Sequence, residues 1–220
     1  MASLDSFTVQ APRMLPVIVA ADRSGSMAEN GKIEALNLAL REFVDSLREV
    51  SNPRGEIHLA VYSFGGAEVT CEVPLEAISK ISGVGEIPAE GMTPMGQAFK
   101  QLKDLIEDVD RVPHRAYKPT LLLISDGIPT DDWIYQLSEL VDKGRSAKSY
   151  RFALAIGDDA DREMLGRFVT NSEYLMTGDK ARDIRKFFRW VSMSVSVRLL
   201  SQSPNGPQLL PLLDDDTLEL

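Results

Sequence analysis

The sequence predicts an α/β fold: a doubly wound, mostly parallel sheet with one antiparallel edge strand and helices on both faces. Two observations support this prediction. Short apolar runs alternate along the chain with longer stretches in which apolar residues recur every three or four positions, as strands and helices do in α/β domains. In addition, the runs at 16–21 and 120–125 are apolar at nearly every position, which is typical of central parallel strands buried between two helix layers.

The first half of the chain supplies a buried strand, a long amphipathic helix and a strand pair. After the strand at 16–21, apolar residues at helical spacing from Ile33 to Leu47 predict a helix, which the following Asn-Pro-Arg-Gly sequence ends. Gly65-Gly66 then predicts a turn between two antiparallel strands. The predicted elements in order are a helix over 32–50, a strand over 57–64, an antiparallel edge strand over 67–73 and a short helix over 75–81.

The second half continues the alternation. Apolar residues at helical spacing from Met95 to Val109 predict a helix, with Thr93 as its cap and Pro94 at its first position. The remaining predicted elements are a strand over 120–125, a helix over 131–143, a strand over 151–156, a short helix over 161–168, a small strand around Tyr174 and a long helix over 179–200.

The length of the chain, 220 residues, fits one domain with a substantial core. We expect an N-terminal arm over 1–13, the domain over 14–200 and a C-terminal tail over 201–220. The tail begins where the composition changes to Ser, Pro, Asn and Gly, before leucines and acidic residues.

Composition and charge argue against several classes of function. The net charge is −9 and the sequence pI is about 4.8, whereas a general nucleic-acid binder depends on basic residues that meet phosphates. Cys71 is the only cysteine, so an intrachain disulfide and a cysteine metal cluster are excluded, and a reducing compartment fits. No apolar run approaches the roughly 18 residues that a membrane-spanning helix needs. We therefore expect a cytoplasmic protein that binds neither nucleic acid nor membrane.

Polar side chains follow the first buried strand in the sequence Asp22-Arg23-Ser24-Gly25-Ser26. On a turning loop, alternate residues can direct their oxygens to one point, and oxygen ligands suit Mg²⁺ or Mn²⁺ better than zinc. This pattern alone is weak evidence, because turn and cap residues after strands have the same composition.

Two further motifs strengthen the prediction of a metal site. Thr93 stands in a Gly-Met-Thr-Pro-Met-Gly sequence before a predicted helix, and Asp126 follows the buried strand that ends at Ser125. Ligands of open α/β sheets bind outside the carboxyl ends of the strands, where the winding direction reverses. If the strands before Asp22 and Asp126 are neighbours, their carboxylates converge.

Together and in this order, the three motifs resemble those of the von Willebrand factor A domain, which has a Rossmann-like fold and a metal-ion-dependent adhesion site. The resemblance covers about 14–197, and residues 118–133 narrow it to the bacterial tellurite-resistance (TerY-like) group. It implies that the hydroxyls of Ser24, Ser26 and Thr93 bind the metal directly, and that Asp22 and Asp126 act mostly through bound waters. The expected ion is Mg²⁺ or Mn²⁺, with Ca²⁺ less favoured.

From this site we expect a non-enzymatic domain that binds an Asp or Glu carboxylate of a protein partner through the metal. The resemblance implies a role in tellurite resistance, stress response or phospho-signalling, with a kinase or phosphatase as a candidate partner. The absence of a nearby His or Lys to manage protons argues against catalysis. The alternatives are a metal-assisted phosphohydrolase or other hydrolase that uses the same site, and a structural domain without metal. The oligomeric state stays open.

Three secondary features have two interpretations each. Arg23 either favours an acidic ligand or lies in solvent. The basic stripe formed by Arg182, Arg185, Lys186 and Arg189 is better explained as a solvated helix face, and the alternative is a docking surface for an acidic partner. The sequence of the tail over 208–220 favours a segment that is flexible or packs locally, and the alternative is that it inserts a carboxylate into the metal site of a neighbouring molecule.

Overall fold

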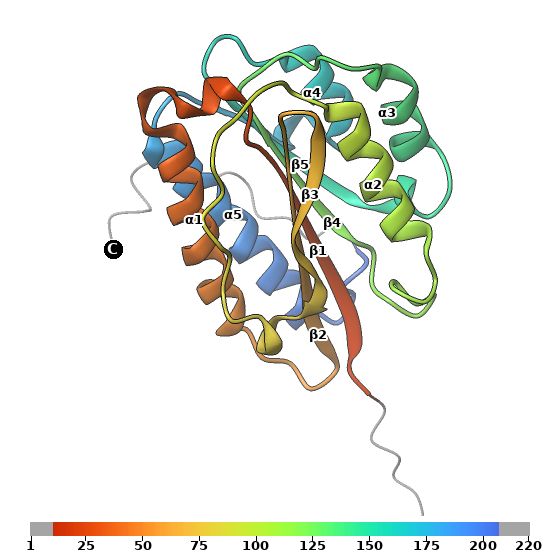
Figure 1. The fold of residues 1–220 in the computed structure, drawn as a ribbon. Coiled ribbons are helices and arrows are strands. Elements are labelled where there is room, and N and C mark those ends of the chain that lie inside the picture. The colour runs from red at the N-terminus through yellow and green to blue at the C-terminus, as the bar shows by residue number, and fades with distance from the viewer. Residues whose placement is uncertain (1–10, 207–220) are drawn as a thin grey trace, which may run out of the picture.

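The computed structural model describes residues 11–206 and shows a sheet between two layers of helices (Figure 1). The sheet has six strands in the order β3-β2-β1-β4-β5-β6. Only the edge strand β3 is antiparallel to its neighbour. The predicted fold class is therefore confirmed. The strands are β1 (Arg13–Asp22), β2 (Gly55–Gly65), β3 (Glu68–Ala77), β4 (Thr120–Ser125), β5 (Tyr150–Ile156) and β6 (Leu175–Gly178).

Helices cover both faces of the sheet, and each layer packs on its own hydrophobic cluster. One layer consists of α1 (Lys32–Arg48) and α5 (Ala181–Leu200). The other consists of α2 (Met95–Glu107), α3 (Trp133–Asp142) and α4 (Arg162–Phe168). Short 3₁₀ helices lie at Gly25–Gly31, Ile78–Lys80, Ser146–Lys148 and Ser172–Tyr174. None of the helices in residues 11–206 combines the length and the apolar character needed to cross a bilayer.

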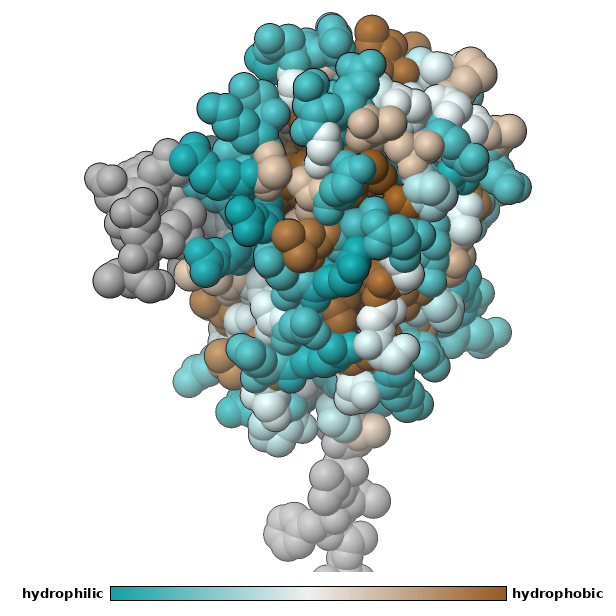
Figure 2. All heavy atoms as spheres, turned by 60° about the vertical axis from the view of Figure 1, so that its left-hand side comes forward, coloured by the Kyte–Doolittle hydropathy of each residue, from teal (hydrophilic) through white to brown (hydrophobic). Residues whose placement is uncertain are grey.

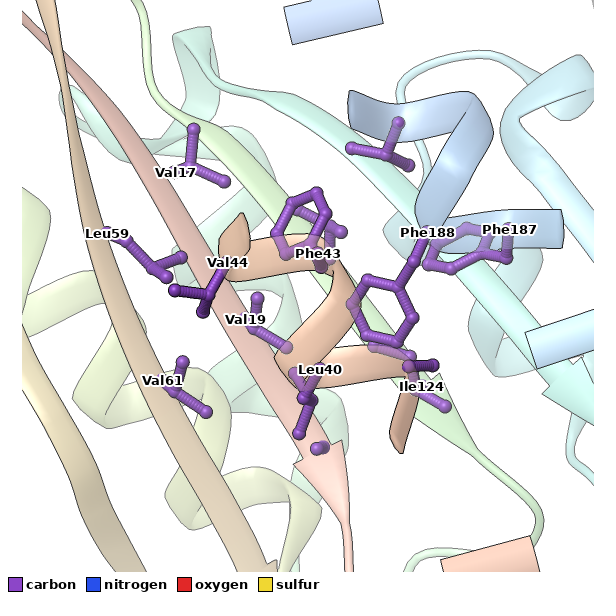
Figure 3. Close-up of a cluster of buried hydrophobic side chains, with 14 of the residues drawn as sticks. Val17, Val19, Leu40, Phe43, Val44, Leu59, Val61, Ile124, Phe187 and Phe188 are labelled. Carbon is purple, nitrogen blue, oxygen red and sulfur yellow. The ribbon is translucent and has the colours of Figure 1, made fainter. Parts of the chain in front are cut away.

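The central strands divide their side chains between the two layers. Val17 and Val19 of β1 face the α1–α5 layer, where Phe43 and Phe188 fill the space above them (Figure 3). Ile18, the residue between these valines, belongs to the cluster under α2. Because alternate strand residues point to opposite faces, a strand buried on both faces must be apolar throughout. This explains the continuous apolar runs in the sequence.

Most predicted boundaries differ from the structure by one to four residues, among them those of β1, of the helix predicted over 75–81 and of the last strand. β1 begins at Arg13 instead of residue 16, because Arg13 pairs with Gly55 at the start of β2. The helix predicted over 75–81 is wrong: β3 continues to Ala77 through a bulge, which leaves only the 3₁₀ turn Ile78–Lys80. Cross-strand pairing overrides the local helical pattern there. The last strand begins just after Tyr174. The predicted tail over 208–220, and its proposed insertion into a neighbouring metal site, lie outside the described residues.

Arg198 anchors the end of α5 beneath the sheet. It is fully buried, and its guanidinium carbon lies over the ring of Tyr150, 4.3 Å from the ring centroid. It donates hydrogen bonds to Thr120 Oγ1, to Lys118 O at 2.9 Å and to Pro204 O at 3.2 Å. Burial lowers the pKa of Arg198 to about 10. This side chain thus joins α5 and residues 201–206 to the start of β4.

We predict that Arg198→Met lowers the free energy of unfolding by about 2–4 kcal/mol, because it leaves buried acceptors without a donor. Urea denaturation followed by circular dichroism measures the change. Arg54→Met is the control, since Arg54 is exposed. Equal stability of the two variants would contradict the anchoring role.

Candidate metal centre

The strand order places the predicted site residues at one edge of the sheet. β1 and β4 are parallel neighbours, with Ala21 opposite Ile124, so Asp22 and Asp126 emerge at the same level. The chain leaves β1 toward α1 on one face, whereas α2 leads into β4 from the other face. This reversal is the place where open α/β sheets bind ligands.

Hydrogen bonds directly connect the loop that follows β1 with the loop that follows β4. The carboxylate of Asp22 is fully buried and accepts from Ser24 N at 2.8 Å and from the Ser125 hydroxyl at 2.6 Å. Ser24 Oγ lies 3.1 Å from Ser26 Oγ, and the Ser26 hydroxyl donates to Asp126 Oδ1 at 2.7 Å. Four of the five predicted site residues therefore form one hydrogen-bonded group.

Thr93 approaches this group from the loop before α2. A Cβ atom added to Gly127 would lie 3.5 Å from Thr93 Oγ1 and 3.9 Å from both Asp22 Oδ2 and Ser26 Oγ. Oxygens from two separate segments, the loop after β1 and the loop before α2, thus lie around one point beside Gly127, where residue 127 has no side chain. Hydroxyl and carboxylate oxygens are the ligands that hard divalent cations prefer. The residues present therefore fit such an ion.

The charge balance supports the same conclusion. Burial raises the pKa of Asp22 to about 6, against the opposing effect of the hydrogen bonds from Ser125 and Ser24. Those donors are neutral, so the charge of this buried carboxylate is not matched by a direct cationic contact among the described residues. A divalent ion at this edge would favour the ionised form.

Lys32 is a site residue that the sequence analysis missed. It is the first residue of α1, and its Nζ lies 2.7 Å from Asp126 Oδ2, whose side chain is fully buried. The expectation that no Lys lies near the site is therefore wrong. The ammonium group neutralises one of the two carboxylates, in the way a bound cation would. The sequence offered only weak evidence that Lys32 belongs to the site, since a Lys after a glycine at the start of a helix is common.

Arg23 stabilises the arrangement of the loops. It is buried, which excludes the interpretation that it lies in solvent. Its guanidinium donates to Glu90 Oε1 at 2.5 Å, while Glu90 N donates to Arg23 O at 2.7 Å. Gly25 N also donates to Gly91 O at 2.9 Å. These contacts hold the loop that carries Thr93 against the loop that carries Ser24 and Ser26.

The predicted capping role of Thr93 is wrong. Pro94 occupies the N-cap position of α2, and no side chain of the cap residue bonds to the helix. Asp131, from the loop before α3, accepts instead from Gly96 N at 2.8 Å and from Gln97 N at 3.0 Å. The Thr93 hydroxyl is therefore not used for capping and remains beside Gly127. Sequence reasoning missed Asp131 because its partner is far away in the chain.

Comparisons with known proteins bear on this geometry. A family model for the von Willebrand factor type A domain matches residues 17–190. Proximal thread matrix protein 1 from the mussel byssus, solved with a zinc-occupied MIDAS motif, is 18% identical with a TM-score of 0.60, over 83% of this chain and 45% of that one. The pilus adhesin SpaC from Lactobacillus rhamnosus GG is 14% identical with a TM-score of 0.71, over 86% of this chain and 31% of that one.

A third structure, the manganese-loaded TRAP protein of Plasmodium vivax, is 14% identical with a TM-score of 0.55, over 80% of this chain and 74% of that one. At these identities the likeness concerns the fold alone. The chain spans less than half the length of the mussel and pilus proteins. The search of curated proteins finds no significant match.

We predict that Gly127→Ala preserves the fold but lowers the affinity for a divalent ion by about tenfold, because the new methyl group enters the space between the oxygens. Calorimetric titration measures the affinity. Gly83→Ala is the matched control, since a Cβ atom at Gly83 meets nothing within 4 Å. An unchanged affinity in the Gly127 variant would place any bound ion elsewhere.

Proposed function

We propose that this chain, which belongs to the von Willebrand factor type A domain family, is a protein-interaction module that uses a divalent cation to bind a carboxylate of its partner. The observation that carries the proposal is the convergence of the Ser26, Thr93 and Asp22 oxygens around one point beside Gly127. Ser24 and Asp126 complete the set through hydrogen bonds.

The proposed roles follow from the chemistry of these donors. Ser24, Ser26 and Thr93 would hold the ion through neutral hydroxyls, and Asp22 and Asp126 would add charge mostly through bound waters. Because the direct ligands are neutral, the ion when bound supplies an electrophilic centre for an outside carboxylate. Mg²⁺ and Mn²⁺ are the ions we favour. The mussel and Plasmodium structures with zinc and manganese support a divalent ion without selecting one.

The biological pathway, the cellular context and the type of partner remain predictions. Tellurite resistance, stress response, a bacterial context and a kinase or phosphatase partner follow only from the likeness of residues 118–133 to the TerY-like group, and the cytoplasmic context follows from the single cysteine and the lack of a long apolar run. A pull-down from the native host with and without EDTA would identify partners that depend on the metal.

A hydrolase is the second candidate, and Lys32 is the observation that favours it. A cationic side chain beside a metal site can stabilise developing negative charge. In the structure, however, this ammonium group is already paired with Asp126. A screen of phosphate esters with Mg²⁺ or Mn²⁺ separates the two functions: turnover abolished by Lys32→Met would favour the hydrolase.

We predict that Asp22→Ala and Thr93→Ala each lower the affinity for Mg²⁺ by about tenfold or more, because each removes an oxygen from the site. Isothermal titration calorimetry gives the affinity. Thr93→Ser, which keeps the hydroxyl, is the matched control and should bind nearly as well as the native chain. Full affinity in both alanine variants would remove this site from the proposal.

We also predict opposite effects of Lys32→Met on stability and on metal binding. Without metal, the variant is less stable by about 2–4 kcal/mol, because the buried carboxylate of Asp126 keeps the hydrogen bond from Ser26 but loses its cationic partner. With Mg²⁺, the affinity rises by about tenfold, because the competing ammonium charge is gone. Thermal unfolding with and without Mg²⁺ measures both effects, with Lys32→Arg as the control that keeps the charge. A fall in Mg²⁺ affinity would show that Lys32 orients Asp126 for the ion instead.

A further inference from the structure

A groove of about 1180 Å³ runs between α1 and α5, and none of the five proposed metal-site residues lines it. The two helices lie side by side on the same face of the sheet (Figure 1). Phe43 and Phe188, whose ring centroids are 5.0 Å apart, line it from opposite helices. Figure 2 brings the side that carries α1 forward and shows hydrophobic patches among hydrophilic side chains there.

The groove changes character along α5. Its part near the end of the helix is apolar and open to solvent: Met193, Val197 and Leu200 are 36%, 37% and 62% exposed. Its part near the start of the helix is mainly basic, since Arg185 and Arg189 line it there. Two acidic residues of α1, Glu42 and Glu49, also line the groove, so its basic character comes from α5. Neither of these two arginines has a carboxylate partner within residues 11–206. An occupant of matching chemistry would be apolar at one end and acidic at the other.

We propose that the occupant is the segment 207–220 of this same chain. Its sequence has leucines at 209, 210, 212 and 213, followed at once by Asp214, Asp215 and Asp216. The order from apolar to acidic therefore matches the order from apolar to basic along the groove, read from the end of α5 toward its start. This proposal does not depend on the metal centre.

The described part of the chain ends in a position that suits this path. Residues 201–206 turn back after α5 and are held under the sheet, where Tyr150 donates its hydroxyl to Asn205 O and Gly206 O at 2.9 Å and Lys118 N donates to Asn205 Oδ1 at 2.8 Å. With Arg198 bound to Pro204 O, the chain is fixed near the apolar end of the groove.

The segment is also long enough to reach from Gly206 to the basic part of the groove. Asp214 is eight residues beyond Gly206, which allows about 26 Å of extended chain. Arg189 and Arg185 stand 11 and 15 residues before Leu200, or about 17 and 22 Å along the helix axis. The leucines would lie over Val197 and Met193, and the aspartates would reach the arginines. Because the segment is tethered, its effective concentration at the groove is on the order of millimolar.

Disulfide cross-linking in the full chain tests the proposal. In a Cys71→Ser background, which removes the only native cysteine, the pair Ser196→Cys and Leu212→Cys joins the groove to the segment. We expect an intrachain disulfide to form about tenfold faster than in the control pair Lys100→Cys and Leu212→Cys, which points to the opposite helix layer. Equal rates in the two pairs would overturn the proposal.

Charge reversal tests whether the aspartates of the segment pair with the arginines of the groove. Arg185→Glu with Arg189→Glu should slow the cross-link about fivefold, whereas Lys100→Glu with Lys148→Glu on the other layer should not. Combining the arginine changes with Asp214→Lys, Asp215→Lys and Asp216→Lys should restore the rate. Mostly interchain disulfides at low protein concentration would overturn the proposal in favour of a second copy as occupant. An unchanged rate after charge reversal would overturn the matched-charge docking.

Discussion

The parallel pairing of β1 with β4 is the constraint on which the rest of the structure depends. Both strands are buried on both faces, so their side chains are almost entirely apolar and polar groups appear only where the strands end. The register brings these ends to one level, with Asp22 as the last residue of β1 and Asp126 directly after β4. The loops after β1 and β4 are separated by about half the chain. The pairing of the strands alone would bring them together into a single surface, even without contacts between the loops themselves.

Charge at this surface is distributed unevenly. Asp126 is matched by Lys32, whereas Asp22 is held by neutral donors, and Arg23 is already paired with Glu90. The edge therefore carries more negative than positive charge in a setting where burial makes uncompensated charge costly. This imbalance, together with the hydroxyl groups between the carboxylates, is why a cation fits the edge better than a neutral or anionic ligand.

Sequence reasoning worked where local pattern and structure agree. The two central strands were recognisable because a strand that is buried on both faces must be apolar at nearly every position. Asp22, Thr93 and Asp126 were recognisable because they stand at the ends of strands or just before a helix. The contacts of Arg23 with Glu90, Lys32 with Asp126 and Asp131 with the start of α2 were not recognisable. Each joins residues more than 30 positions apart, and nothing in the local sequence of one partner indicates the other. The extension of β3 over the predicted short helix has the same origin, because its pairing with β2 is decided across strands.

The position of β1 has a mechanical consequence. The loop from Asp22 to Ser26 continues directly from this strand, and β1 is paired in parallel with β2 on one side and β4 on the other. A pull on anything bound at that loop acts along the strand axis, so the two ladders bear it in shear. Their hydrogen bonds must then break together instead of one after another, as they would if an edge strand were peeled away. Tension applied to this loop would therefore be resisted by two parallel ladders at once.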